Sequence, residues 1–301
     1  MMSKIVYSVD LIHKRRDEPD FHLYVGIARI SDLKPHEEII EDYLEKLSSI
    51  IRKCKFLKNP IIVDLNSNVI LDGMHRWHAL KRMGFKYIGV CYVDYRDPRV
   101  KLRRWFRFLK GRVDVNLLIK ELKELRKQGV LEGEWVSIAE VEGLEKGGIL
   151  LGGYGEVFLP EFDNREKLLY YRSLDSVIEY LSKKFRLKLE YRPDVDLPGA
   201  QRLLEEYSVI VAMPTLSKNE VVEVALAGLV YPPKTTRHEI PARPMFMNFP
   251  LGLLRKRDAD LPALNEHLRK LLRYKNVLYI SSGLEVEREY REDIILFWES
   301  G

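Results

Sequence analysis

Hydrophobic positions along the chain follow two repeats, one typical of strands and the other typical of helices. Short β-branched runs at residues 60–64 and 69–71 flank turn formers at 66–68, a pattern that predicts a β-hairpin. The next apolar positions, within residues 75–83, recur at helical spacing and stop at Gly84. Strand, Asp-Gly turn and helix therefore follow one another in close order.

The same patterns predict both helices and strands over the rest of the chain. Helices are expected from the 34–38 segment to about residue 53 and at 115–128, 165–184, 217–227 and 262–273. Strands are expected at 29–33, 87–95, 187–191, 208–212 and 277–280, with a hairpin across 149–159. Because the two types are interspersed, we expect a mixed fold of helices and strands, of the α+β (mixed α/β) class.

Length and composition suggest two domains and do not indicate a particular binding partner. The chain has 301 residues, 46% of them hydrophobic, which exceeds one typical domain length. Its organisation changes at about residue 113, so domains are expected at 1–113 and 114–301. Basic and acidic residues nearly balance at a net charge of +5, which does not demand nucleic acid. The basic cluster between Arg96 and Arg112 either favours phosphates or is a solvated face.

Cysteine usage and hydropathy point to the cytoplasm. Cys54 and Cys91 form no CxxC pair, so neither a zinc site nor a disulfide framework is indicated. The N-terminus has no positively charged lead into an apolar stretch, and no run approaches the ~18 apolar residues of a membrane span. We expect a cytoplasmic protein without membrane contact, either a monomer or a small homo-oligomer.

Residues 71–76, Leu-Asp-Gly-Met-His-Arg, occupy the junction of the predicted strand and helix. Backbone N–H groups at the helix start would point into the turn beside His75 and Arg76, which favours an anion there. Asp72 could bind Mg²⁺ directly or through water, and the missing Cβ of Gly73 lets a phosphate approach the backbone. The alternative is that Asp72 caps the helix and Arg76 is a solvated surface residue.

A second group of polar residues follows the prolines at 232–233. Five donors are consecutive there: Lys234, Thr235, Thr236, Arg237 and His238. Arginine offers a planar fork to a carboxylate or phosphate, and the hydroxyl and imidazole groups add directed hydrogen bonds. A polar surface loop without a ligand is the other interpretation.

Two single residues are weaker candidates. Glu37 lies at the predicted start of a helix, where capping is the first explanation and a role as general base or metal ligand the second. Its neighbour Glu38 cannot be ranked against it. Trp105 lies in the basic cluster, and packing in the core is a more frequent role for such a residue than lining a ligand site.

These motifs together resemble the archaeal free L-serine kinase family, whose fold is shared with sulfiredoxin and the N-terminal domain of ParB. The resemblance rests on Leu33-Lys-Pro-His-Glu37, the segment 69–77, Trp105 and Pro233-Lys-Thr-Thr-Arg-His238, in this order. It covers roughly residues 28–245. It implies a ParB/sulfiredoxin-like nucleotide-binding domain at the N-terminus. The α/β domain that follows would pack against it, form the active-site cleft and contribute the substrate-binding loop 233–238.

The resemblance implies a reaction and its residues. Members phosphorylate L-serine to O-phospho-L-serine, a step towards cysteine, with ADP or ATP as donor and Mg²⁺. By position, Glu37 matches the catalytic base, Asp72 the aspartate near the metal and the reacting phosphoryl group, and Gly73, His75 and Arg76 the phosphate cradle, with Met74 where many relatives carry histidine. Trp105, Thr236, Arg237 and His238 match residues around serine, with Lys234 and Thr235 in the same loop.

Two other functions share the implied fold. A sulfiredoxin needs a cysteine nucleophile in the phosphate loop, and the thioether of Met74 cannot replace a thiolate. A ParB-like nucleotide-dependent DNA-binding or regulatory protein needs a helix-turn-helix after the first domain. Residues 114–130 predict one helix, but glycine-rich strands follow it. The sequence does not choose between ADP and ATP, or between serine and threonine, and it gives no role to residues 250–301.

Overall fold

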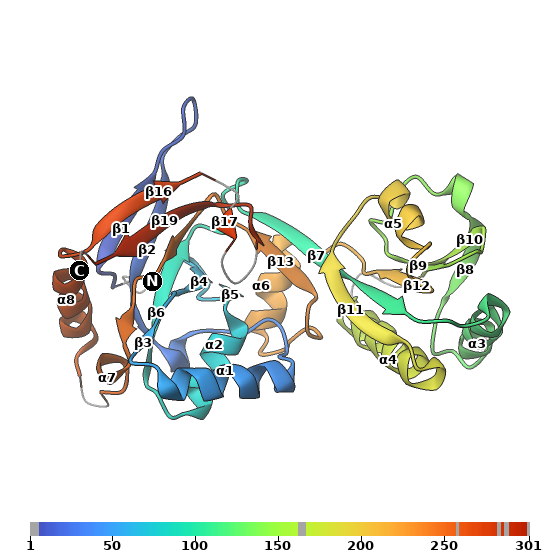
Figure 1. Cartoon of the computed structure of the whole chain (residues 1–301), viewed down its shortest axis with the longest axis horizontal. Coiled ribbons are helices and arrows are strands. Elements are labelled where there is room, and N and C mark those ends of the chain that lie inside the picture. Colours follow the sequence, from blue (N-terminus) through green and yellow to red (C-terminus); the bar gives the residue numbers. More distant parts are fainter. Residues whose placement is uncertain (1–5, 162–166, 257–258, 282–283, 286–288, 300–301) are drawn as a thin grey trace. The chain divides into compact units, whose positions relative to one another are not determined.

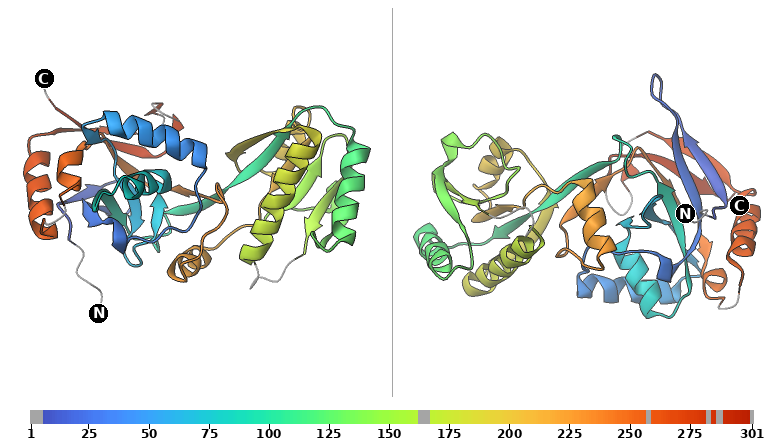
Figure 2. Two further views of the ribbon diagram at one scale, coloured as in Figure 1. Left: turned by 90° about the horizontal axis from the view of Figure 1, so that it is seen from below. Right: turned by 180° about the vertical axis from the view of Figure 1, so that it is seen from behind.

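The computed structural model describes residues 6–161, 167–256, 259–281, 284–285 and 289–299. The chain forms two compact units, each drawn in Figures 1 and 2. Unit 1 comprises residues 1–101, 218–230 and 238–301, and unit 2 comprises residues 102–217 and 231–237. The chain therefore leaves unit 1 twice, after residues 101 and 230, and returns to it twice, at residues 218 and 238.

These units differ from the expected division at residue 113. Residues 102–113 belong to unit 2, and residues 238–301 belong to unit 1. The reason is pairing between distant segments, such as that of β3 (Phe56–Leu57) with β15 (Phe249–Pro250). A local hydrophobic pattern carries no signal for such a pair.

Unit 1 is built on a five-stranded sheet. Its strands, in spatial order, are β1 (Val9–His13), β2 (Phe21–Arg29), β6 (Tyr87–Val93), β4 (Ile61–Asp64) and β5 (Ile70–Asp72). β4 and β6 are parallel and buried along their whole length, while the other neighbours are antiparallel. The helices α1 (Glu41–Lys53) and α2 (Met74–Arg82) contact each other (Figure 1). The predicted hairpin 60–71 and the helix that follows it are confirmed.

The predicted helix start at residues 34–38 is wrong, because α1 begins at Glu41. Lys34 forms a parallel β-bridge with Val69, and this pairing holds the segment extended. Buried His36 adds a hydrogen bond to Ile70 O. Glu37 therefore does not cap the helix, whose N-cap residue is Ile40.

The C-terminal part of the chain completes unit 1. The strands β14 (Ala242–Met245), β19 (Asp293–Trp298) and β16 (Asn276–Ile280) form a three-stranded sheet, β17 (Leu284–Glu285) pairs with β18 (Glu289–Tyr290), and the helices are α6 (Lys218–Leu226), α7 (Leu251–Leu254) and α8 (Leu261–Leu272). Asn265 of α8 hydrogen-bonds both backbone groups of Ile27 in β2, at 2.9 and 3.0 Å. The segment from residue 250, which had no expected role, is thus an integral part of the unit.

Unit 2 contains most of a seven-stranded sheet. The strand order is β11 (Lys188–Pro193), β7 (Lys101–Lys110), β12 (Val209–Ala212), β9 (Gly148–Leu151), β10 (Glu156–Pro160) and β8 (Gly133–Ser137), and β13 (Thr236–Glu239) also pairs with β7. The helices are α3 (Val115–Lys127), α4 (Lys167–Phe185) and α5 (Leu197–Leu203). Alternate residues of β7 serve different faces. Phe106 and Phe108 pack with Ala200 of α5, whereas Arg107 pairs with Asp175 of α4.

The predicted basic cluster is neither a phosphate site as a whole nor only a solvated face. Arg107 is fully buried and its Nη2 donates to Asp175 Oδ1 at 3.2 Å. Arg99 pairs with Asp97, and Lys110 pairs with Glu206. Much of the positive charge is therefore balanced within the chain.

Within the described range 114–161, α3 is followed by the strands β8, β9 and β10. A second helix that could act as a recognition helix does not follow α3 in that range, as the DNA-binding alternative would need. Among the residues that the structure describes, no helix is long and apolar enough to span a membrane.

Candidate active site

The turn between β5 and α2 has the geometry of an anion site. Gly73 is the N-cap residue of α2 and is left-handed, with φ at 97°. A Cβ here would lie 2.5 Å from Ile61 Cγ2 and 2.9 Å from Arg76 Nη2, so only glycine fits without displacing its neighbours. Backbone N–H groups in the first turn of a helix have no partner inside the helix and attract an anion.

Asp72 holds two arginine side chains beside this turn. Arg76 Nη2 donates to Asp72 Oδ2 at 3.2 Å, and Arg243 Nη1 donates to the same oxygen at 2.6 Å. Arg76 Nη1 donates to two backbone carbonyl oxygens at 3.1 and 2.7 Å. The alternative in which Asp72 caps α2 is wrong, because Gly73 is the N-cap and no side chain caps the helix.

Sequence reasoning missed Arg243, which lies on β14. Its side chain is buried, and its Nε donates to Glu292 Oε1 at 3.0 Å. Burial lowers the pKa of Arg243, but the adjacent carboxylates of Asp72 and Glu292 outweigh that effect and raise the pKa above its usual value. Arg243 lies in a segment without a recognisable motif, so the sequence did not indicate that it contacts Asp72.

Met74 and His75 fix the start of α2. His75 Nε2 accepts a hydrogen bond from Ile40 N at 3.1 Å, which ties the helix start to the segment before α1. The Met74 side chain is buried, so only its backbone N–H can serve a phosphate. The four predicted phosphate-binding residues, 73–76, are thus brought together on one turn.

Glu37 lies beside His36 in the extended segment before α1. Its Oε2 is 4.0 Å from His36 Nε2, and its side chain is 14% exposed. His36 Nδ1 donates to Ile70 O at 2.6 Å. Burial lowers the pKa of His36 to about 4, against the opposing effect of the bond to Ile70. A neutral, buried ring therefore anchors this segment to β5, the strand that ends at Asp72.

His238 lies in unit 1 with His36, apart from the other members of its polar string. Its Nε2 is 2.8 Å from Tyr95 Oη, and its ring meets that of His36 edge-on, with centroids 5.5 Å apart. Burial and then the neighbouring His36 lower the pKa of His238 well below its usual value. Its neutral ring packs in the interior of unit 1.

The rest of that string belongs to unit 2 and surrounds Trp105. Lys234 Nζ and Arg237 Cζ lie 4.8 and 6.0 Å from the centroid of the Trp105 ring, and Trp105 Nε1 donates to Thr236 O at 3.1 Å. The expected loop is partly wrong, because residues 236–239 form β13, which pairs with β7. Alternation along this strand separates side chains that a loop would have left adjacent.

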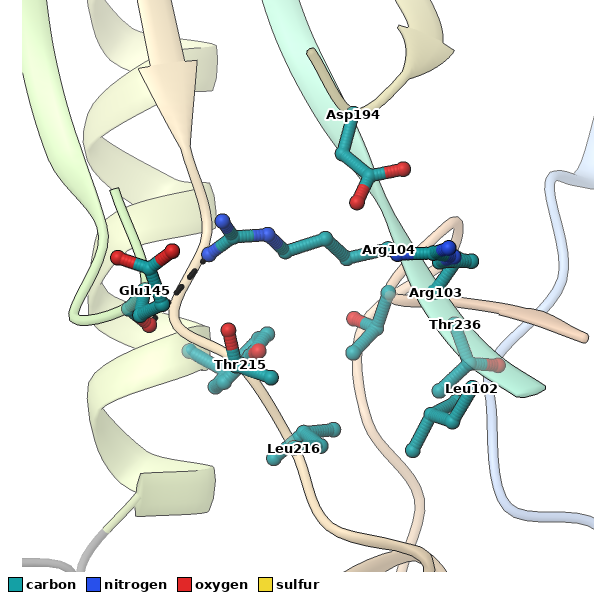
Figure 3. Close-up of a pocket in the computed structure, with 10 residues that line it drawn as sticks. Leu102, Arg103, Arg104, Glu145, Asp194, Thr215, Leu216 and Thr236 are labelled. Atoms are coloured by element: carbon teal, nitrogen blue, oxygen red, sulfur yellow. Dashed lines mark hydrogen bonds between the residues drawn. The ribbon is translucent and has the colours of Figure 1, made fainter. Parts of the chain in front are cut away.

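Thr235 and Thr236 line a pocket of about 210 Å³ in unit 2. Its charged residues are Arg103, Arg104, Glu145 and Asp194. Figure 3 shows the Arg104 side chain extended across the pocket towards Glu145. The last two carboxylates were not expected here, since neither belongs to a recognisable motif.

The side chains at this turn fit Mg²⁺ only if most of its ligands come from substrate phosphates and water. Among the described residues, no three or more histidine, cysteine, aspartate or glutamate side chains are grouped to hold a metal ion. Asp72 Oδ2 already accepts from two guanidinium groups. Magnesium is commonly held by one or two carboxylates together with substrate phosphates and water, and a single carboxylate such as Asp72 suffices for that arrangement.

Comparison with known proteins gives a consistent result. The chain is 32% identical over 249 residues to an ATP-dependent L-serine kinase of Staphylothermus marinus, covering 79% of this chain and 94% of the relative. It is 31% identical over 232 residues to an ADP-dependent L-serine kinase of Thermococcus kodakarensis, covering 73% and 88%. No family model matches the chain.

A solved structure agrees in fold. A free serine kinase variant in complex with AMP matches with a TM-score of 0.62 and 24% identity, covering 76% of this chain and 93% of that chain. The predicted mixed α/β fold, with its likeness to free serine kinase, is confirmed.

Proposed function

The chain belongs to the L-serine kinase family, and on this premise we propose that it transfers a phosphoryl group from ATP or ADP to free L-serine. The serine oxygen would form a bond to the terminal phosphorus while the bond from that phosphorus to the bridging oxygen breaks. The products would be O-phospho-L-serine, a precursor for cysteine biosynthesis, and either ADP or AMP.

The turn at residues 72–76 is the observation that carries the proposal. Phosphoryl transfer depends mainly on positioning and on neutralising charge, with little covalent chemistry for the protein. The left-handed Gly73 exposes backbone N–H groups at the start of α2, and Arg76 adds a positive charge. Arg243 adds a second positive charge, held in place by Glu292. Together these groups suit the phosphates of a nucleotide.

Glu37 is proposed as the general base. It would take the proton from the serine hydroxyl as the oxygen attacks. Its position next to the neutral His36 and the strand that ends at Asp72 supports this role. Glu38 is the control for this assignment, because the sequence alone did not rank the two.

The substrate side is proposed to comprise Trp105, Lys234, Thr235, Thr236 and Arg237, with His238 in a positioning role. Arg237→Ala should raise the serine KM about tenfold with a smaller change in kcat, because one charged hydrogen bond contributes about 1.5–3 kcal/mol. Arg112→Ala, at an exposed position, is the control and should leave the KM unchanged.

Mg²⁺ is proposed to bind chiefly to the nucleotide phosphates, with Asp72 as the protein carboxylate, directly or through water. When bound, it would offset charge on the phosphoryl group. Chelation with EDTA should abolish turnover, and added Mg²⁺ should restore it.

The test is a product assay with matched donors and acceptors. The full chain is incubated with L-serine and Mg²⁺, once with ATP and once with ADP, and O-phospho-L-serine is sought by mass spectrometry. L-threonine in place of L-serine tests the acceptor, since one methyl group is worth only about 1–3 kcal/mol of discrimination. Absence of O-phospho-L-serine with both donors would contradict the proposal.

A further inference from the structure

The pocket of unit 2 holds charges of both signs that the fold does not pair. Arg104, Glu145 and Asp194 line it together with Arg103, Thr215 and Thr236. Among the residues that the structure describes, Arg104, Glu145 and Asp194 form no ion pair, whereas Arg103 has an interaction within the chain. A charge in such a position is available to a ligand of opposite charge.

Arg104 is a fixed and largely desolvated cation. Its Nη1 donates to Leu144 O at 2.7 Å, to Glu145 O at 3.4 Å and also to Met213 O. Burial lowers its pKa, against the raising effect of Tyr171 and the two nearby carboxylates. All three of these bonds use one nitrogen and neutral carbonyl oxygens, so the rest of the planar fork can face a carboxylate.

The carboxylates come from different elements. Asp194 follows β11, and its backbone N donates to Arg104 O at 3.3 Å, which fixes it beside β7. Glu145 precedes β9, and its backbone O accepts from Thr215 N at 2.8 Å. In Figure 3, Glu145 lies at the guanidinium end of the Arg104 side chain, and Asp194 lies beside the part of that side chain nearer to β7.

Mixed charge and small size select the class of ligand. At about 210 Å³ the pocket is smaller than the ~300–1,000 Å³ typical of drug-sized ligands, which favours a ligand smaller than a nucleotide. A simple anion would meet two carboxylates, and a simple amine would meet Arg104. A small zwitterion meets a partner at each end.

We propose that this pocket binds the two charged groups of the amino-acid substrate, with Arg104 taking the α-carboxylate and Asp194 and Glu145 the α-ammonium. This inference rests on the proposed kinase function and assigns three residues that the family motifs do not mark. Thr215, which also lines the pocket, carries a hydroxyl group that can add a directed hydrogen bond. Leu102 and Thr236, which also line the pocket, lie within two residues of the points where the chain crosses between units.

Isothermal titration calorimetry of L-serine into the full chain tests the pocket independently of turnover. Asp194→Asn keeps the shape and removes the charge, and it should weaken L-serine binding about tenfold or more, as expected for a hydrogen bond to a charged group. Glu145→Gln, at an exposed position, should weaken it in the same direction and serves if Asp194→Asn does not fold. Glu142→Gln, an exposed neighbour outside the pocket, should bind like the wild type.

Two truncated ligands separate the ends of the zwitterion. 3-Hydroxypropionate lacks the ammonium, so its affinity should not fall in Asp194→Asn. Ethanolamine lacks the carboxylate, so its affinity should not fall in Arg104→Lys, whereas that of L-serine should. Equal losses for L-serine and 3-hydroxypropionate in Asp194→Asn would overturn the assignment of the ammonium.

The outcomes distinguish this inference from the kinase proposal. If the wild type makes O-phospho-L-serine but Asp194→Asn and Glu145→Gln bind L-serine like Glu142→Gln, the pocket assignment fails and the kinase stands. If the wild type makes no product but binds L-serine in a manner sensitive to Asp194→Asn, the kinase fails and the pocket stands. If L-serine does not bind, the pocket assignment fails.

Discussion

The turn at residues 72–76 and the pocket of unit 2 differ in whether their charged side chains form ion pairs within the chain. At the turn, Asp72 pairs with Arg76 and Arg243, and Arg243 also pairs with Glu292. In the pocket, Arg104, Glu145 and Asp194 form no ion pair among the described residues. The charges of the turn are paired by the fold itself, and those of the pocket would be paired by the proposed ligand.

This difference determines whether a substitution changes mainly the folding free energy or mainly the ligand affinity. Removing one member of a buried network leaves another charge without a partner, which costs folding free energy. Removing a charge that has no partner in the fold costs little stability and shows mainly in ligand affinity. Variants of the paired charges at the turn should therefore change unfolding as well as nucleotide binding, whereas variants of the pocket should change mainly the binding of L-serine.

The largest expected effect is on the chemistry proposed for unit 1. Glu37→Gln should lower kcat by about 10²–10⁴-fold, the usual contribution of general base catalysis, because an amide cannot accept the proton. Its fold should be retained. Steady-state kinetics measure the change, with Glu38→Gln as the matched control at near wild-type rate. Reversed effects in the two variants would move the base to Glu38.

Next in size is the effect of breaking the paired network. Arg243→Met should lower the free energy of unfolding by about 3–5 kcal/mol, because it removes a buried cation and leaves Glu292, whose side chain is only 10% exposed, without this partner. Denaturant unfolding measures it. Arg82→Met removes an exposed pair with Glu41 and should cost at most about 1 kcal/mol. Equal, small losses in both variants would show that the turn is not held by this network.

The buried rings beside the turn predict a pH dependence of similar size. The pKa of His36 is about 4, below the usual 6.5, so the unfolded chain takes up the proton more readily. The contribution of neutral His36 to the free energy of unfolding is fully present above pH 6.5. It is lost as the pH falls towards 4, and the loss is about 3 kcal/mol for this residue.

Unfolding curves between pH 7 and pH 4 measure that loss. His36→Gln should flatten the dependence, although His238 acts in the same direction and will leave part of it. The exposed residue His267 gives the control, His267→Gln, which should keep the wild-type dependence. An unchanged dependence in His36→Gln would refute the role of its burial.

The smallest expected effect isolates the turn backbone. Gly73→Ala adds a Cβ that would lie 2.5 Å from Ile61 Cγ2, and it places alanine at a left-handed φ that strains its backbone. The substitution should cost about 1–3 kcal/mol of stability and weaken nucleotide binding. Gly84→Ala, also left-handed at φ 74° but in open space, should cost only the backbone strain and leave nucleotide binding unchanged. Nucleotide titration of both variants distinguishes the two causes, and equal affinities would count against the anion site.

Sequence reasoning succeeded where the structure depends on neighbouring residues. The hairpin 60–71, the turn at Gly73 and the helix α2 are local, so their pattern predicted them. It failed where distant segments decide the conformation. Because Lys34 bridges to Val69, α1 begins later in the sequence than predicted. Because β13 pairs with β7, half of a predicted loop is a strand.

The candidate site divides in the same way. Motif residues such as Glu37 and Asp72 could be proposed from the sequence because they occur in a recognisable order. Arg243, Asp194 and Glu145 were not, because nothing in the sequence separates them from the many other charged residues. Only the folded chain brings Arg243 to Asp72 and places two carboxylates beside Arg104.

The proposed phosphorylation of free L-serine is measured most directly by ³¹P NMR of the full chain mixed with L-serine, Mg²⁺ and either ATP or ADP. We expect the growth of a phosphomonoester signal that coincides with added O-phospho-L-serine and is absent when L-serine is omitted. A spectrum in which neither donor yields that signal would contradict the proposal.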